Sequence, residues 1–142
     1  MPNDRKFRIL IIDDDVGFRD LLRLHLKAAG YEVQVAEDGV TGGRALLEQT
    51  PDLVVSDLNM PYLDGFELLR LLHSDVETAT IPVILLSGRS DSDTMAKAVG
   101  LGASDYLTKP VTRDQLLESI EACLSRIKGR TNPPDYGSTP TV

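Results

Sequence analysis

PDLVVSDLNMP, residues 51–61, contains the strand around which the rest of the chain is arranged. Residues 53–55 are apolar, mostly β-branched, and lie between Pro51 and a polar segment, a pattern typical of a strand buried on both faces of a parallel sheet. Such a strand ends near Asp57, at the sheet edge where open α/β folds bind their ligands. We therefore predict that Asp57 is the reactive group, against the alternative of an ordinary turn carboxylate.

Length and composition indicate one globular domain. The 142 residues are 42% hydrophobic and 26% charged, and no apolar run approaches the roughly 20 residues that cross a bilayer. Without a secretory signal either, the chain is expected to be cytoplasmic and to have no membrane partner. The net charge of -7 opposes binding to a phosphate backbone, so direct nucleic-acid binding is not expected. The single cysteine, Cys123, is predicted to be a core residue.

Apolar strand patterns and helical patterns alternate along the chain. Five such pairs predict an α/β fold with a parallel sheet and helices on both faces. Gly42 and Gly43 are expected to loosen the second helix, and Gly100 and Gly102 follow a fourth helix with only a thin apolar stripe. The predicted strands are residues 7–12, 31–36, 53–57, 81–86 and 104–108, and the predicted helices are residues 16–29, 40–49, 66–73, 92–99 and 113–128.

Two segments of the chain are distinguished by their apolar content. Residues 1–128 are predicted to form the domain. Residues 129–142 contain three Pro and almost nothing to bury, so we expect a flexible tail or the start of an interdomain linker. The chain is then either a single-domain protein or, as we slightly prefer, part of a longer one.

Polar side chains follow the ends of four predicted strands. Asp13 and Asp14 follow the first, Asp57 ends the third, and Ser87 and Lys109 follow the fourth and fifth. Because the carboxyl ends of parallel strands share one edge, we expect these side chains to lie together. Three carboxylates repel one another unless a cation intervenes, and oxygen-only ligands suit Mg²⁺. The sequence therefore predicts a magnesium site beside Asp57, with Lys109 as a second positive charge.

The same residues indicate phosphoryl transfer. A carboxylate acts as a nucleophile on phosphorus, and a metal ion and an ammonium stabilise the charge on the transferring oxygens. The sequence contains no Ser-His-Asp set, no phosphate-binding G-x-x-x-x-G-K-[ST] loop and no G-x-G-x-x-G motif, so the usual hydrolase and nucleotide-binding classes are not favoured. His25 and His73 are predicted to be surface histidines in helices away from the site.

At these residues the sequence resembles the receiver domain of two-component response regulators. The matching pieces are ILIIDDD, DLNMPYLDG, IPVILLSGRSD and GASDYLTKP, and the resemblance covers about residues 7–127. It implies a flavodoxin-like, doubly wound sheet of five parallel strands in the order 2-1-3-4-5 with five helices. It also implies a cis peptide bond between Lys109 and Pro110.

The resemblance implies a role for each site residue. Asp57 would accept the phosphoryl group from the phosphohistidine of a histidine kinase or a histidine phosphotransfer protein, in a Mg²⁺-dependent reaction. The chain would not be an enzyme in the usual sense, since it would only phosphorylate itself from a donor and dephosphorylate slowly. Asp13, Asp14, Asp57 and the backbone carbonyl of Asn59 would bind Mg²⁺, and Ser87 and Lys109 would contact the phosphoryl oxygens.

The resemblance also implies a switch. Phosphorylation would draw in Ser87 and turn Tyr106 inward, which reshapes the surface of the fourth helix, fifth strand and fifth helix. That surface would regulate an output domain or a partner, and a homodimer that forms on phosphorylation is a further expected partner.

Two other functions are weighed against this one. A Mg²⁺-dependent phosphatase with an aspartyl nucleophile would need an acid two residues after it, and Asn59 is not an acid. The other alternative is a degenerate receiver that acts only as a binding module. The presence of the acidic pair Asp13 and Asp14, and of Asp57 and Lys109, opposes it.

Overall fold

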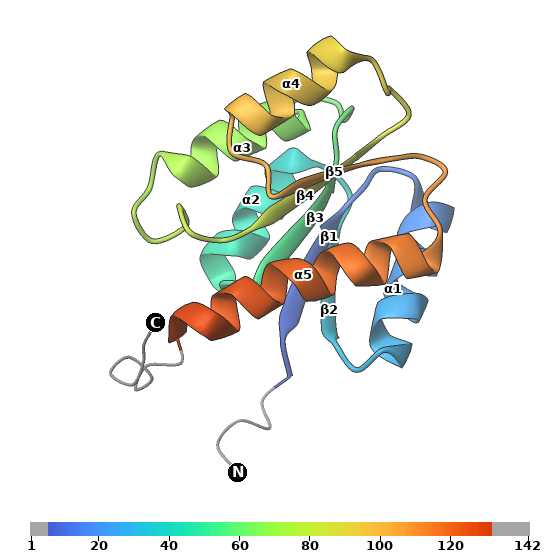
Figure 1. Ribbon diagram of the computed structural model, residues 1–142, viewed down its shortest axis with the longest axis vertical. Coiled ribbons are helices and arrows are strands. Elements are labelled where there is room, and N and C mark those ends of the chain that lie inside the picture. Colours follow the sequence, from blue (N-terminus) through green and yellow to red (C-terminus); the bar gives the residue numbers. More distant parts are fainter. Residues whose placement is uncertain (1–5, 132–142) are drawn as a thin grey trace.

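The computed structural model describes residues 6–131, and these form five strands and five helices in alternation (Figure 1). Every predicted element is present, with its ends within three residues of the expected positions. The strands are β1 Arg8–Ile12, β2 Glu32–Ala36, β3 Leu53–Asp57, β4 Val83–Ser87 and β5 Asp105–Thr108, and the helices are α1 Val16–Ala28, α2 Gly39–Glu48, α3 Gly65–His73, α4 Ser92–Gly100 and α5 Arg113–Thr131.

The five strands form one parallel sheet in the order β2-β1-β3-β4-β5, as predicted. In the register, Ile12 of β1 lies opposite Ser56 of β3, and Asp57 lies opposite Leu86 of β4. The last residues of these central strands are therefore side by side. This arrangement brings the polar residues that follow β1, β3, β4 and β5 to one edge of the sheet.

The sheet lies between two layers of helices (Figure 1). Side chains of β1 alternate between them, because successive residues of a strand point to opposite faces. Ile9 and Ile11 pack in a core with α1 and α5, while Leu10 and Ile12 pack in a core with α2, α3 and α4. All four side chains are fully buried. A sheet covered on both faces explains the continuously apolar strands in the sequence.

The helices α5 and α4 differ in how much they bury. On α5, the residues Leu116, Ile120, Cys123 and Leu124 are all buried against the sheet. On α4, only Thr94 and Ala98 are buried, so the thin apolar stripe expected for this helix is confirmed.

Two glycines are explained by backbone geometry and packing. Gly30 has a φ of 99°, a left-handed conformation that favours glycine, and it follows the end of α1. A Cβ atom on Gly42 would lie 2.5 Å from Cδ1 of Ile12. Gly42, expected only to loosen α2, therefore has a packing role, because it lets α2 approach β1 closely.

The helix α5 continues to Thr131, three residues beyond the end predicted at residue 128. The rest of the predicted tail, residues 132–142, lies outside the described residues, so the division into domain and tail stays a prediction. Within residues 6–131, no helix has the length and apolar character needed to cross a membrane.

Candidate functional site

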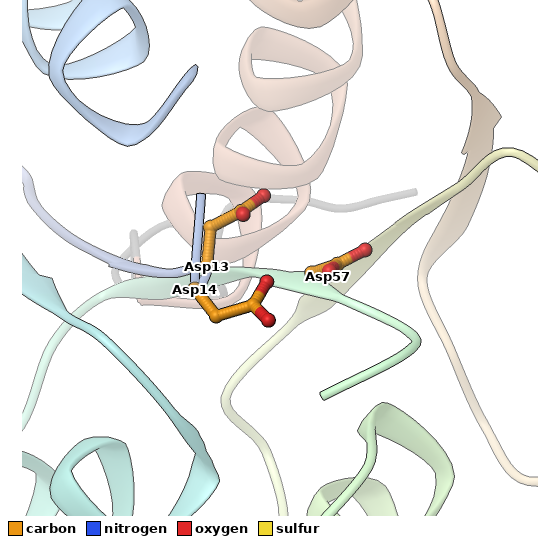
Figure 2. Close-up of side chains that lie close together, drawn as sticks. All are labelled: Asp13, Asp14 and Asp57. Atoms are coloured by element: carbon orange, nitrogen blue, oxygen red, sulfur yellow. The ribbon is translucent and has the colours of Figure 1, made fainter. Parts of the chain in front are cut away.

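Three carboxylates meet at the carboxyl edge of the sheet, as the sequence predicts. Asp13 and Asp14 follow β1, and Asp57 ends β3. One carboxylate oxygen from each lies within 4.8 Å of those of the other two, and Figure 2 shows the side chains gathered at this edge. Asp13 and Asp57 are only 1% and 7% exposed, while Asp14 is exposed. The cluster is therefore held in the protein and open to solvent on the Asp14 side.

The backbone around Asp13 is fixed from three directions. Its N–H donates to the carbonyl of Ala36 at 3.1 Å, and its Oδ1 accepts from the N–H of Asp15 at 2.9 Å. Arg19 of α1 donates from Nη1 to the carbonyl of Asp13 at 3.0 Å. These bonds set the direction in which the turn after β1 presents its carboxylates.

Lys109 links two of the carboxylates. Its Nζ lies 3.3 Å from Oδ2 of Asp13 and 3.3 Å from Oδ1 of Asp57. Its own backbone N–H donates to the carbonyl of Ser87 at 2.7 Å, and the peptide bond to Pro110 is cis, as the family resemblance implies. The four-carbon chain of Lys109 thus spans from the end of β5 to the acidic residues after β1 and β3.

Burial and neighbouring charges both shift the pKa values of Asp57 and Lys109. Burial raises the pKa of the Asp57 carboxyl, the Lys109 ammonium lowers it, Asp13 raises it again, and the net shift is upward. Burial lowers the pKa of Lys109, but Asp13 and Asp57 together raise it more, so the net shift is also upward. The cluster contains three carboxylates and one ammonium, and such an oxygen-rich acidic donor set fits a hard divalent cation.

The remaining predicted residues come from β4, β5 and the segment after β3. Ser87 is fully buried at the end of β4, and its Oγ accepts the N–H of Arg89 at 3.0 Å. Tyr106 is half-buried, and its hydroxyl donates to the carbonyl of Arg89 at 2.6 Å. Asn59 is exposed, two residues after Asp57. Ser87 and Tyr106 therefore contact the same residue, a connection that the sequence does not reveal.

The two histidines are in the last turns of α1 and α3. In this topology the helices begin at the carboxyl edge of the sheet and end at the other edge, so His25 and His73 lie away from the carboxylates, as predicted. The ring of His73 instead packs against Gly102, which has a φ of 93°.

Sequence reasoning missed two residues that contact the site. Phe18 lies beneath the ammonium of Lys109, with 4.5 Å from Nζ to the ring centroid, and Arg19 binds the Asp13 carbonyl. Both are in the first turns of α1, directly after the acidic segment. Their position close behind Asp13 is the only sequence signal, because the contacts depend on how α1 is rotated against the sheet.

Comparison with known proteins gives consistent matches. The response regulator receiver domain matches residues 9–121. The chain is 41% identical over 119 residues to the DNA-binding dual master transcriptional regulator RpaA of Synechocystis sp., which covers 84% of this chain and 49% of that protein. It is 41% identical over 123 residues to the C4-dicarboxylate transport transcriptional regulatory protein DctD of Pseudomonas aeruginosa, which covers 87% of this chain and 26% of that protein.

The chain thus spans about half or less of the length of these curated relatives. Both are named as regulators and not as enzymes. RpaA is named as DNA-binding, so the expectation that nucleic acid is not a partner gains no support from the relatives. Among solved structures, the CheY-like response regulator receiver domain protein from Methanospirillum hungatei aligns with a TM-score of 0.83 at 28% identity, covering 89% of this chain and 99% of that one.

Proposed function

Because this chain belongs to the response regulator receiver domain family, we propose that it is a phosphorylatable switch of two-component signalling with Asp57 as the phosphoryl acceptor. One observation carries this proposal: the Lys109 ammonium lies 3.3 Å from both Asp13 and Asp57, within a cluster of three carboxylates at the sheet edge. The arrangement combines a nucleophilic oxygen with the positive charge that an incoming phosphoryl group needs.

The proposed reaction transfers a phosphoryl group from a phosphohistidine. An oxygen of Asp57 forms a bond to phosphorus while the P–N bond breaks, and the leaving imidazole nitrogen keeps the electron pair and takes a proton from solvent. Burial makes this carboxylate more basic and so a better nucleophile than a carboxylate in water. The ammonium of Lys109, already in contact with Asp57, neutralises charge on the transferring oxygens.

Mg²⁺ fits this donor set. Asp13, Asp14, Asp57 and the backbone carbonyl of Asn59 would hold it, because hard oxygen ligands and an excess of negative charge are what this ion requires. When bound, the ion would neutralise negative charge on the phosphoryl oxygens. Ser87 would donate its hydroxyl hydrogen to a phosphoryl oxygen.

The proposed output passes through Arg89. The hydroxyl of Ser87 accepts the N–H of Arg89, and Tyr106 donates to the carbonyl of the same residue. A movement of Ser87 toward a phosphoryl group would therefore shift the backbone of Arg89, to which the Tyr106 hydroxyl is hydrogen-bonded. We expect this shift to alter the surface formed by α4, β5 and α5, which would act on an output domain, an effector or a second phosphorylated copy of the chain.

The donor would be a histidine kinase or a histidine phosphotransfer protein, and the reaction would take place in the cytoplasm. The test is labelling of the purified chain with acetyl phosphate and Mg²⁺, measured as mass gain by intact-protein mass spectrometry. Asp57→Asn should abolish the acid-labile adduct, and EDTA included in the labelling reaction should prevent its formation on the parent protein. The matched control is Asp15→Asn, which changes an exposed carboxylate of the same acidic segment but keeps an oxygen that can cap α1.

Two results would overturn the proposal. One is labelling of Asp57→Asn at the parental level, which would place the phosphoryl group elsewhere. The other is a parent protein that takes up no phosphoryl group from acetyl phosphate or phosphoramidate in the presence of Mg²⁺, which would favour a module that only binds.

A further inference from the structure

Among residues 6–131, two aromatic rings contact a lysine ammonium. Phe18 is the one whose lysine, Lys109, belongs to the site. It lies in the first turn of α1, is half-buried, and packs against the core shared by α1 and α5. The Lys109 ammonium lies over its ring, 4.5 Å from the centroid. The same ammonium is 3.3 Å from a carboxylate oxygen of Asp13 and from one of Asp57.

The face of an aromatic ring attracts a cation, and the attraction grows where water is excluded. The Lys109 side chain is 26% exposed, so much of its surface is already removed from water. Lysine carries its charge on a flexible four-carbon chain, and a single attractive direction does not fix it. Here the carboxylates pull the ammonium from one direction while the ring contributes a second contact.

The ring differs from the carboxylates in one respect that matters for phosphoryl transfer. Asp57 changes its charge and shape when it is phosphorylated, so its contact with Lys109 must rearrange. The ring of Phe18 does not react, and its attraction for the ammonium is the same before and after transfer. It can therefore keep the positive charge beside Asp57 throughout the reaction.

We propose that Phe18 is a positioning residue for phosphoryl transfer, whose ring face holds the Lys109 ammonium beside Asp57. The inference rests on the proposed function of Asp57 as the phosphoryl acceptor. Phe18 does not touch the reacting atoms and acts only through Lys109. The competing explanation is that Phe18 merely anchors α1 against the core, in which case any apolar side chain of similar size serves.

The first test separates these explanations by kinetics. Phe18→Leu keeps an apolar side chain and removes the ring, and we expect the rate of phosphorylation by phosphoramidate to fall roughly threefold to tenfold, the range of cation–π attractions from exposed to partly desolvated sites. Phe18→Tyr keeps the ring and should restore most of the rate. Phe7→Leu is the matched control, because Phe7 packs against the same core but precedes β1, at the other end of that strand from Asp13.

The second test removes the packing variable. Phenylalanine with one, two or three ring fluorines at position 18 changes the ring volume little but withdraws electrons from its face. The rate should fall stepwise with each added fluorine, and the trifluoro protein should approach Phe18→Leu. A rate independent of fluorination would overturn the proposal, as would a Phe18→Leu protein that phosphorylates at the parental rate.

A third measurement does not depend on phosphorylation. The ring current of Phe18 should shift the ε-methylene protons of Lys109 upfield in the NMR spectrum of the unphosphorylated protein, and Phe18→Leu should remove that shift. Absence of the shift in the parent protein would contradict the contact itself. If the shift is present but the parent takes up no phosphoryl group, the function proposed for Asp57 fails while the contact between Phe18 and Lys109 stands.

Discussion

The helices α4 and α5 follow the strands β4 and β5, which end at Ser87 and immediately before Lys109, yet the two helices are held to the sheet very differently. On α5, the large side chains of Leu116, Ile120 and Leu124 are buried in the core with residues of β1, β3 and β4. On α4, the apolar side chain that is fully buried is the small Ala98, while Val99 is 73% exposed. Within one site, Lys109 therefore precedes a firmly packed helix, α5, and Ser87 precedes a weakly packed helix, α4.

This difference suggests a division of roles within the site. Lys109 supplies fixed positive charge, and the helix that follows it, α5, buries an apolar stripe. Ser87 precedes an element with few buried contacts, which belongs to the low-stability end of a fold. An element of this kind responds to a few kcal/mol of changed contact, as a switch requires.

The largest expected effect concerns α5. Ile120→Ala should lower the free energy of unfolding by about 2–5 kcal/mol, because it removes a fully buried side chain and leaves a cavity. Val99→Ala on α4 should change it by less than about 0.5 kcal/mol, because that side chain is already mostly in water. Urea unfolding followed by circular dichroism measures both, and equal losses would break the contrast between the helices.

A smaller effect concerns the two glycines at the end of α4. Gly102→Ala should cost about 1–2 kcal/mol, because the residue has a φ of 93° and a side chain there would also meet His73. Gly100→Ala should stabilise the protein by about 0.5–1 kcal/mol, because the helical position has open space around it. The same unfolding measurement applies, and a stabilising Gly100→Ala should also slow amide exchange in α4. Opposite signs at the two positions are required; a loss of stability in Gly100→Ala would contradict the prediction.

The smallest effect is local and concerns the start of α4. Asp91 caps this helix by accepting from the N–H and the hydroxyl of Thr94, and these bonds lower the pKa of its carboxyl to about 2. A lowered pKa in the folded state means that the cap stabilises the helix above pH 4 and is lost as the pH falls through about 2. Asp91→Ala should speed amide exchange in α4 and leave α5 unchanged.

The control for this prediction is Asp91→Asn, which keeps a capping oxygen and removes the titration. The amide proton shift of Thr94 should titrate with a midpoint near 2 in the parent and stay flat in Asp91→Asn. A midpoint near the ordinary value of an aspartate would show that the bonds from Thr94 do not lower the pKa of Asp91. Faster exchange in α5 as well would show that the effect of the cap is not confined to α4.

Most of the fold follows from the sequence because it depends on local patterns. Buried strands contain short runs that are apolar on both faces, such as residues 53–55, and Gly30 marks the end of α1. Contacts between a helix and the sheet are harder to predict from the sequence. Gly42 was expected only to weaken α2, and its contact with Ile12 appears only when the helix is placed on the sheet. The strand order came from the family resemblance and is confirmed by the structure.

The site divides in the same way. The strand ends are enough to predict that Asp13, Asp14 and Asp57 meet, because topology alone brings them to one edge. The contact of Lys109 with Phe18 depends on how α1 is placed on the sheet relative to the end of β5, and the apolar stripe of α1 does not specify that placement. The shared contact of Ser87 and Tyr106 with Arg89 depends on the path of a loop and is equally hidden.

Cys123 gives the firmly packed layer a chemical reporter. It is the single thiol of the chain, 2% exposed on the buried side of α5, and burial raises its pKa. A thiol reagent can reach it only when α5 separates from the sheet. The rate at which the reagent modifies Cys123 therefore measures how often that separation occurs. Comparing that rate with and without acetyl phosphate and Mg²⁺ measures how often the layer opens in each signalling state, without adding any label to the protein beforehand.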